Sequence, residues 1–135
     1  MIVTVDTNVL VSGVFFGGIP GRILDAARQG VFTVVMSPLL LSELGAVFAR
    51  PRFGLSPKAV QLLMTDVESF ATIVYPRNRH QVVERDRDDD AVVDCAIESR
   101  SAYIVSGDAH LIDLEMVEGI AVVTPRQFVD ILELK

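Results

Sequence analysis

Short apolar runs alternate along this chain with longer segments in which apolar residues recur every three or four positions. Runs rich in Val, Ile and Thr predict β-strands, and they span residues 2–5, 31–36, 71–75, 102–105 and 120–123. The longer segments predict helices at residues 22–29, 38–48, 57–70, 86–97, 111–114 and 125–132. Strands that alternate with helices in this way form a parallel sheet with helices on both faces. The pattern therefore predicts an α/β fold, a three-layer α/β/α sandwich around a mostly parallel five-stranded sheet.

Two stretches of the chain predict loops. Residues 13–21 hold four glycines and one proline, a composition typical of loops, but they lack the spacing of a phosphate-binding glycine loop. Residues 77–89 are the most charged part of the chain, which favours an exposed loop. Serine–proline pairs at 37–38 and 56–57 predict helix starts, because Ser caps a helix well and Pro suits its first position.

Carboxylates follow two of the predicted strands. Asp6 comes directly after the strand at 2–5, and Asp108 follows the strand at 102–105. Because the carboxyl ends of parallel strands meet at one edge of a sheet, where ligands bind in such folds, the two acids are candidate site residues. Taken alone, Asp6 is better explained as the cap of a short helix, and the repeat of the pattern at Asp108 favours a site.

Further acids lie near the starts of predicted helices. Glu43 lies in the second turn of the helix that follows the second strand, where it either points toward the sheet edge or simply faces solvent. Asp90 and Asp94 stand four apart on one helix face. Two carboxylates this close repel each other unless a cation or solvent screens them, and both explanations remain open for Asp94.

Asp6, Glu43, Asp90 and Asp108 are together expected at the carboxyl edge of the sheet. Four carboxylates in one cleft cannot all stay ionised without a counter-charge. A set of oxygen ligands, in a chain that has no cysteine cluster, favours binding of Mg²⁺ or Mn²⁺. Two such ions about 4 Å apart activate a water and stabilise the leaving oxygen in the displacement of a phosphodiester, so these residues predict phosphodiester hydrolysis.

Composition narrows the functional classes. The 135 residues suit one domain spanning 1–135, and the single cysteine excludes an intramolecular disulfide. No apolar stretch reaches the roughly 18 residues of a membrane helix, so we expect a cytoplasmic protein. The net charge of −6 counts against nucleic-acid binding, although bound cations would reverse the local charge. Ten of the twelve basic residues are arginines, which suit phosphate contacts or ordinary surface ion pairs.

Four segments together resemble the PIN domain. They are the opening at residues 5–13, Glu43, the acids at 88–90 followed by Cys95 and Ala96, and residues 103–108. The chain is most similar to small prokaryotic PIN proteins of toxin–antitoxin pairs, the VapC group. This resemblance implies a metal-dependent endoribonuclease and a toxin role. It also implies a small antitoxin partner that inserts a basic side chain into the acidic cleft.

The same resemblance assigns roles to single positions. Asp6, Glu43, Asp90 and Asp108 match the acidic quartet that holds Mg²⁺ or Mn²⁺. The implied supporting residues are Asn8, Thr7 and Ser106, and Asp94 is a secondary ligand. Many relatives carry another acid where this chain has His110, a residue that could bind Mn²⁺ or simply lie on the surface.

The sequence also suggests surfaces for partners. We select Arg22, Arg50 and Arg52 as candidate contacts for RNA phosphates. The predicted loop at 13–20 carries four apolar side chains, Val14, Phe15, Phe16 and Ile19. We expect them to form a docking surface for an antitoxin, or for a second copy of the chain in a homodimer or higher oligomer. No membrane partner is expected.

Three other classes of protein share features with this sequence. A receiver domain needs paired acids after its first strand and a lysine after its fifth, and this chain has only Asp6 and no such lysine. A haloacid-dehalogenase-type phosphatase needs an acid two positions after its nucleophilic Asp, where Asn8 stands. A catalytically dormant protein of the same fold that binds RNA or protein remains open.

Overall fold

A six-stranded sheet forms the centre of the computed structural model, which describes residues 1–77 and 87–132, with side chains from residue 90 in the second range. The strand order is β3-β2-β1-β4-β6-β5. All neighbours run parallel except β5, which is antiparallel to β6. The strands are β1 (Ile2–Val5), β2 (Thr33–Met36), β3 (Ala71–Ile73), β4 (Tyr103–Val105), β5 (Met116–Val117) and β6 (Ile120–Val123).

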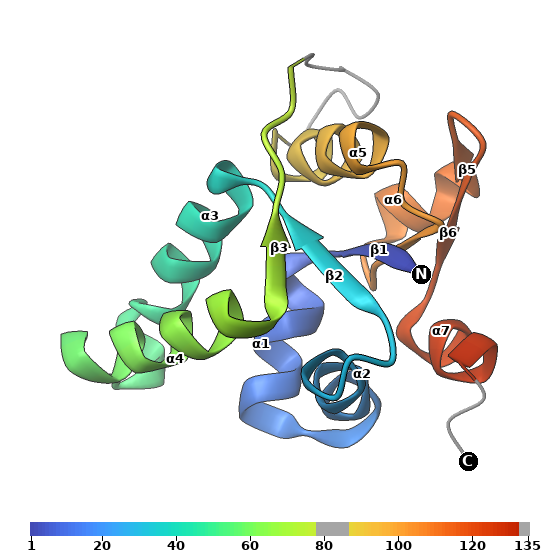
Figure 1. The fold of residues 1–135 in the computed structure, drawn as a ribbon. Coiled ribbons are helices and arrows are strands. Elements are labelled where there is room, and N and C mark those ends of the chain that lie inside the picture. The colour runs from blue at the N-terminus through green and yellow to red at the C-terminus, as the bar shows by residue number, and fades with distance from the viewer. Residues whose placement is uncertain (78–86, 133–135) are drawn as a thin grey trace.

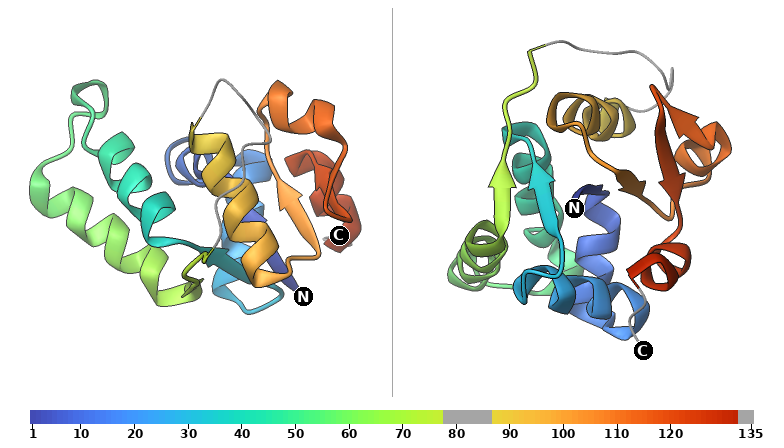
Figure 2. Two further views of the ribbon diagram at one scale, coloured as in Figure 1. Left: turned by 90° about the horizontal axis from the view of Figure 1, so that it is seen from above. Right: turned by 45° about the vertical axis from the view of Figure 1, so that its right-hand side comes forward.

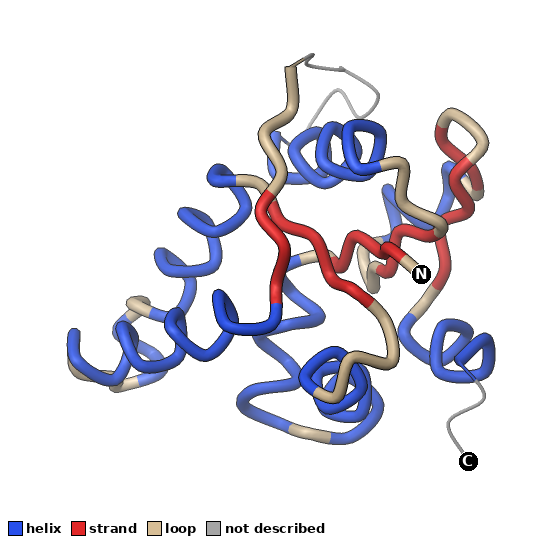
Figure 3. Tube along the Cα trace, viewed as in Figure 1, coloured by secondary structure: helices blue, strands red, loops and turns tan. Residues whose placement is uncertain are grey.

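Helices lie on both faces of this sheet (Figures 1 and 3). They are α1 (Thr7–Phe16), α2 (Gly18–Arg28), α3 (Pro38–Phe48), α4 (Pro57–Phe70), α5 (Arg87–Ser99), α6 (Ala109–Leu114) and α7 (Pro125–Leu132), with a 3₁₀ turn at Pro51–Phe53. Helix α5 crosses one face against β1, β2 and β4. Helices α1, α2 and α7 lie on the opposite side, and α3 and α4 project together beyond β3, as Figure 1 and the left view of Figure 2 show. The predicted α/β fold with a mostly parallel sheet is confirmed.

Strand β1 is buried on both faces because its side chains alternate between the two helix layers. Thr4 faces α5, where its hydroxyl shares a hydrogen bond of 2.9 Å with Ser101 and lies 4.0 Å from the sulfur of Cys95. Val3 and Val5 therefore point to the other layer, and both are fully buried. This burial holds the end of the strand, and the acid that follows it, in one position.

Cys95 lies in this core as a small buried side chain. It is a free cysteine with no solvent exposure. Burial raises the pKa of its thiol to about 12, because the thiolate would lose its hydration. Cys95 is therefore a packing residue and not a nucleophile.

The sixth strand was absent from the sequence prediction. Strand β5 has two residues and pairs with β6 across the turn at Glu118 and Gly119, both of which have positive φ. A two-residue turn of this kind suits the twist of a hairpin. Two residues are too few to show an alternating pattern, so this edge strand could not be recognised from periodicity.

The prediction of a loop at residues 13–21 is wrong. Helix α1 runs through Gly13, and only Gly17, with φ of 67°, separates it from α2, which it meets at 103°. A Cβ on Gly13 would lie 2.6 Å from Cδ1 of Leu24, so this glycine serves the close packing of two helices and not a turn. Of the predicted loop at 77–89, residues 78–86 lie outside the described residues, and α5 already begins at Arg87.

Within the described residues, no single helix is long and apolar enough to cross a membrane. Helices α1 and α2 reach the required length and apolar character only as a bent pair. Much of their apolar surface is buried in the core.

Gly13→Ala is expected to destabilise the fold by about 1–3 kcal/mol, because the added methyl group overpacks the contact with Leu24. Gly45→Ala in α3 is the matched control, since its Cβ would lie 3.8 Å from Met64 in ordinary contact. That control is expected to be neutral or stabilising by about 0.5–1 kcal/mol. Urea unfolding followed by circular dichroism measures both, and equal stability of the two variants would contradict the packing argument.

Candidate functional site

Asp6 is held in a defined orientation at the end of β1. Its backbone N–H donates to the carbonyl of Val105 on β4 at 2.9 Å. One carboxylate oxygen, Oδ2, accepts a hydrogen bond of 2.8 Å from the hydroxyl of Ser106. The other oxygen accepts from the backbone N–H of Asn8 at 3.4 Å and thereby caps α1. The side chain is buried, so Asp6 is both a helix cap and a carboxylate at the carboxyl edge of the sheet.

Ser106 connects the two acids that follow neighbouring strands. It is fully buried, donates to Asp6 and accepts a hydrogen bond of 2.9 Å from the backbone N–H of Asp108. The carboxylate of Asp108 in turn accepts from the backbone N–H of His110 at 2.7 Å and caps α6. Because β1 and β4 pair in parallel with Val5 beside Val105, residues a hundred positions apart meet here. The side chain of His110 is exposed.

Glu43 lies in the second turn of α3. The start of this helix is capped as predicted, because Ser37 accepts from the N–H of Leu40 at 3.2 Å and Pro38 takes the first position. Glu43 as a whole is half-buried and engaged in interactions, and its oxygen Oε2 is fully buried. The cap fixes the register of α3 and therefore the direction in which Glu43 leaves the helix.

Asp90 and Asp94 lie one turn apart on α5, the helix that packs against α3. Both are half-buried and engaged in interactions. The sequence also placed acids at 88 and 89, whose side chains lie outside the described residues. Packing of α3 on α5 places Glu43 and Asp90 on neighbouring helices, while Asp6 and Asp108 come from neighbouring strands.

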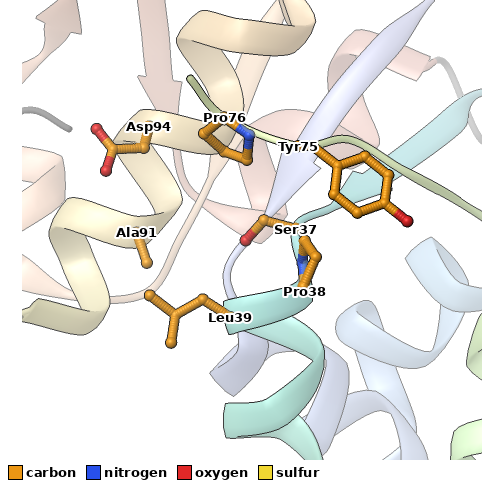
Figure 4. A pocket seen from close by; sticks show the side chains of 7 residues that line it. All are labelled: Ser37, Pro38, Leu39, Tyr75, Pro76, Ala91 and Asp94. Carbon is orange, nitrogen blue, oxygen red and sulfur yellow. The ribbon is translucent and has the colours of Figure 1, made fainter. Parts of the chain in front are cut away.

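Two cavities open near these elements. One has a volume of about 380 Å³ and is lined by Asp108, Gly107, Asn8, Val9, Ser12, Pro20 and Pro125. The other cavity has a volume of about 230 Å³ and lies between the start of α3, the segment after β3 and helix α5 (Figure 4). These walls consist of residues 37–39, of Tyr75 and Pro76, and of Ala91 and Asp94. Asn8, which the resemblance implied as a supporting residue, borders the first cavity with Asp108, and Thr7 is buried in the first turn of α1.

The donor set at this edge consists of carboxylate and hydroxyl oxygens, which are the ligands that Mg²⁺ and Mn²⁺ prefer. In the described part of the chain, no three side chains of the types Asp, Glu, His and Cys lie close enough to hold one ion together. Mg²⁺ is usually held by one or two carboxylates, with waters and substrate phosphates completing its shell. The oriented carboxylate of Asp6, with Asp108 beside it across Ser106, fits that mode of binding.

The three candidate arginines lie on the surface. Arg22 is exposed on α2 and engaged in interactions. Arg50 and Arg52 are exposed on either side of Pro51 at the far end of α3, and the guanidinium of Arg52 lies 4.7 Å from the centre of the Phe53 ring. Their contacts with RNA phosphates stay a prediction.

Comparison with known proteins identifies the class of protein. The PIN domain profile matches residues 2–110, and the chain therefore belongs to the PIN domain family. It is 31% identical to the uncharacterized protein MJ1680 of Methanocaldococcus jannaschii over 143 aligned positions, which cover 97% of this chain and 91% of that protein.

Solved structures share the fold. VapBC2 of Rickettsia felis, solved bound to a DNA fragment from its promoter, gives a TM-score of 0.66 at 15% identity and covers 92% of this chain and 98% of that one. PAE2754 of Pyrobaculum aerophilum gives a TM-score of 0.63 at 15% identity, with coverage of 99% and 90%. At this identity the likeness concerns the fold.

The sequence interpretation missed the cavity beside α5. It treated Ser37 and Pro38 only as a helix start, and Tyr75 and Pro76 only as the end of a strand. The signal that could have found the cavity is that both segments follow strands, β2 and β3, that pair in parallel. Segments after such strands meet at the same edge of the sheet as Asp6 and Asp108.

Proposed function

We propose that this protein is a Mg²⁺- or Mn²⁺-dependent endoribonuclease, and that it acts in the cytoplasm as the toxin of a toxin–antitoxin pair. The observation that carries the proposal is the hydrogen-bonded connection from Asp6 through Ser106 to Asp108 at the carboxyl edge of the sheet. Proteins of the PIN domain family are generally nucleases, and this connection gives the present chain an oriented pair of acids for that chemistry.

Each residue of the site has a separate task in this proposal. Asp6 and Asp108 would hold the cation, and Glu43, Asp90 and the secondary ligand Asp94 would supply further negative charge from α3 and α5. Ser106 and the N–H of Asn8 keep the carboxylate of Asp6 in one orientation. A bound Mg²⁺ or Mn²⁺ supplies an activated water and neutralises charge on the phosphodiester. No side-chain nucleophile is required, in keeping with the burial of Cys95.

Cleavage of labelled single-stranded and structured RNAs by the purified protein tests this proposal. Each RNA is incubated with Mg²⁺, with Mn²⁺ or with a chelator. We expect cleavage that depends on the metal and stops with the chelator. A folded protein that binds these RNAs but cleaves none of them with either metal would contradict the nuclease and support a dormant binding module.

The antitoxin part of the proposal has its own support. The Rickettsia felis neighbour was solved as a VapBC complex, and this chain exposes 79% of Phe16, the last residue of α1. Phe15 beside it is unsuitable for docking, because its ring stacks on Phe53 at 4.3 Å between centres and packs against Phe48.

Phe16→Ser is expected to weaken association by about tenfold, because exposed aromatic residues often anchor interfaces. The association concerned is either the complex with an antitoxin encoded by a neighbouring gene or the homodimer. Leu62→Ser on α4 is the control, since Leu62 is also an exposed apolar side chain. Light scattering measures the homodimer, and pull-down with the co-expressed antitoxin measures the complex. Unchanged association of the Phe16 variant in both assays would remove this surface from the proposal.

A further inference from the structure

Charge is divided unevenly between the two halves of this chain. Residues 1–65 carry five cations and three acids, whereas residues 66–135 carry seven cations and 15 acids. Within the first half, residues 44–65 carry three cations and not a single acid. A separation of charge of this kind in an acidic protein indicates a surface that binds a polyanion.

The three cations of this segment lie around the turn that joins α3 to α4. Arg50 follows the end of α3, Arg52 lies in the 3₁₀ turn, and Lys58 lies in the first turn of α4. All three side chains are exposed, and together they form the basic tip of the α3–α4 hairpin. Figure 1 and the left view of Figure 2 show this hairpin projecting away from the sheet, so its tip is open to a large partner.

Aromatic packing orders one side chain of the basic tip. The ring of Phe53 stacks on Phe15 of α1 at 4.3 Å between centres, and the guanidinium of Arg52 lies 4.7 Å from the centre of the Phe53 ring. A guanidinium ordered by such a contact presents a fork of N–H donors that matches a phosphate. Helix α1, which brings Phe15 to the tip, contains no acid and so adds no carboxylate that would neutralise these cations.

Helix stability explains the positions of two of the cations but not of the third. Arg50 and Arg52 follow the end of α3, where a cation complements the helix dipole. Lys58 lies in the first turn of α4, where a cation opposes the dipole. A bound anion gives this unfavourable position a reason.

The basic tip lies within reach of a strand of RNA that also contacts the acids. Helices α1 and α3 both begin at the carboxyl edge of the sheet, directly after β1 and β2. Arg50 follows Glu43 by two helical turns of α3, which is about 10 Å at 1.5 Å per residue. Stacked nucleotides rise by about 3.4 Å each, so the tip lies a few nucleotides away from the acids.

We propose that the basic tip binds the phosphodiester backbone of single-stranded RNA, a few nucleotides away from the phosphate that is cleaved. Three cations around one turn offer several phosphate contacts, and such contacts are independent of base sequence. An acidic protein is the other class of polyanion that fits these charges. RNA is favoured because one strand reaches both the tip and the proposed site, and thereby connects two surfaces that α1 and α3 already join.

This inference rests on the proposed function, because it takes RNA as the ligand, but binding tests it without cleavage. Labelled oligouridylate and oligoadenylate of about twelve nucleotides, long enough to span tip and acids at about 3.4 Å per nucleotide, are titrated with the full chain in chelator at several salt concentrations. Without metal the acids repel RNA, so the basic tip dominates binding. Lys58→Gln is expected to weaken binding of both RNAs about fivefold at about 0.1 M salt, and to reduce the salt slope by about 0.7, as for one lost phosphate contact.

Two further variants and a stability measurement control this experiment. Arg52→Gln is expected to weaken binding by a similar factor. Arg100→Gln is the matched control, because Arg100 is exposed at the end of α5, near the amino end of β1, and its removal should leave affinity and salt slope unchanged. The Tm of Lys58→Gln is expected to equal or slightly exceed that of the wild type, since the substitution removes a cation that opposes the dipole of α4.

Several results would overturn the inference. Wild-type affinity and salt slope in both Lys58→Gln and Arg52→Gln would do so, as would an equal loss in Arg100→Gln, which would indicate an effect of total charge. A loss for only one of the two RNAs would indicate base recognition in place of backbone contacts. Displacement of the RNA by polyglutamate at an equal concentration of charges would favour an acidic protein partner.

Cleavage kinetics separate this inference from the proposed function. In Mn²⁺, Lys58→Gln is expected to raise KM about fivefold and to leave kcat unchanged, because a contact remote from the reacting phosphate binds substrate and transition state equally. A fall in kcat at unchanged KM would overturn the inference. RNA that binds through the basic tip but is cleaved with neither metal would leave the tip assigned and overturn the nuclease. Cleavage with wild-type binding in both tip variants would do the reverse.

Discussion

Asp6→Asn is expected to lower RNA cleavage by more than about a hundredfold. Removing a group that only supports a metal ligand costs about 10–100-fold in affinity or activity, and Asp6 is proposed to be a ligand itself. Asn keeps the shape of the side chain and one oxygen that can accept from Ser106, so the fold is expected to persist. The loss of charge at the cation is then the main change, and single-turnover cleavage of a labelled RNA in Mg²⁺ and in Mn²⁺ measures it.

The control for this prediction is Asp113→Asn. Asp113 is an exposed acid on α6, the helix that Asp108 caps, so its removal lowers the local negative charge without touching the connection through Ser106. Cleavage by the control is expected to remain within about twofold of the wild-type rate, as for surface substitutions in general. If Asp6→Asn cleaved RNA at the wild-type rate with the same dependence on metal, the assignment of the site would be wrong.

The parts of the site that follow strands could be predicted from the sequence. A run of Ile, Val and Thr that ends in a carboxylate is visible at residues 2–6, and it recurs in residues 103–108. Parallel pairing then brings the two acids to one edge regardless of the residues that separate them. The placement of Asp6 and Asp108 thus follows from strand order, which the alternation of strands and helices indicates.

The packing of helices and loops against one another could not be predicted. Gly13 resembles a loop glycine, and only the packing of α1 on α2 shows that it makes room for Leu24. The cavity beside Asp94 requires that the residues after β2 and β3 meet the face of α5. Local patterns contain no information about which surfaces meet, and at Gly13 they predicted a loop where two helices pack.

The net charge illustrates the same limit. A chain with a charge of −6 repels nucleic acid on average, yet Asp6 and Asp108, the two acids of the proposed site that Ser106 connects, lie at one edge of the sheet. There, a divalent cation would change the sign of the field that an RNA phosphate meets. The position of the carboxylates is therefore more informative than their number, and position depends on the fold.

Ser106→Ala is expected to lower cleavage by about 10–100-fold and to raise the metal concentration needed for half-maximal activity. The hydroxyl holds the carboxylate of Asp6 and accepts the N–H of Asp108, so its loss releases both acids from their relative position. Because the buried carboxylate of Asp6 and the half-buried N–H of Asp108 each lose a partner, the free energy of unfolding should also fall, by about 1–3 kcal/mol. Cleavage as a function of Mn²⁺ and urea unfolding measure the two effects.

Ser101→Ala separates positioning from stability. Ser101 is also a buried serine with two hydroxyl contacts, to Thr4 at 2.9 Å and Ser99 at 2.7 Å, but it lies near the opposite end of β1 from Asp6. Loss of the Ser101 hydroxyl should lower the free energy of unfolding by a similar amount, while the cleavage rate and its dependence on metal stay at wild-type values. Ser106→Thr retains the hydroxyl and should restore most of the cleavage that Ala loses. If the Ser101 and Ser106 alanine variants lost activity equally, Ser106 would act through stability alone. The connection between Asp6 and Asp108 would then have no part in catalysis.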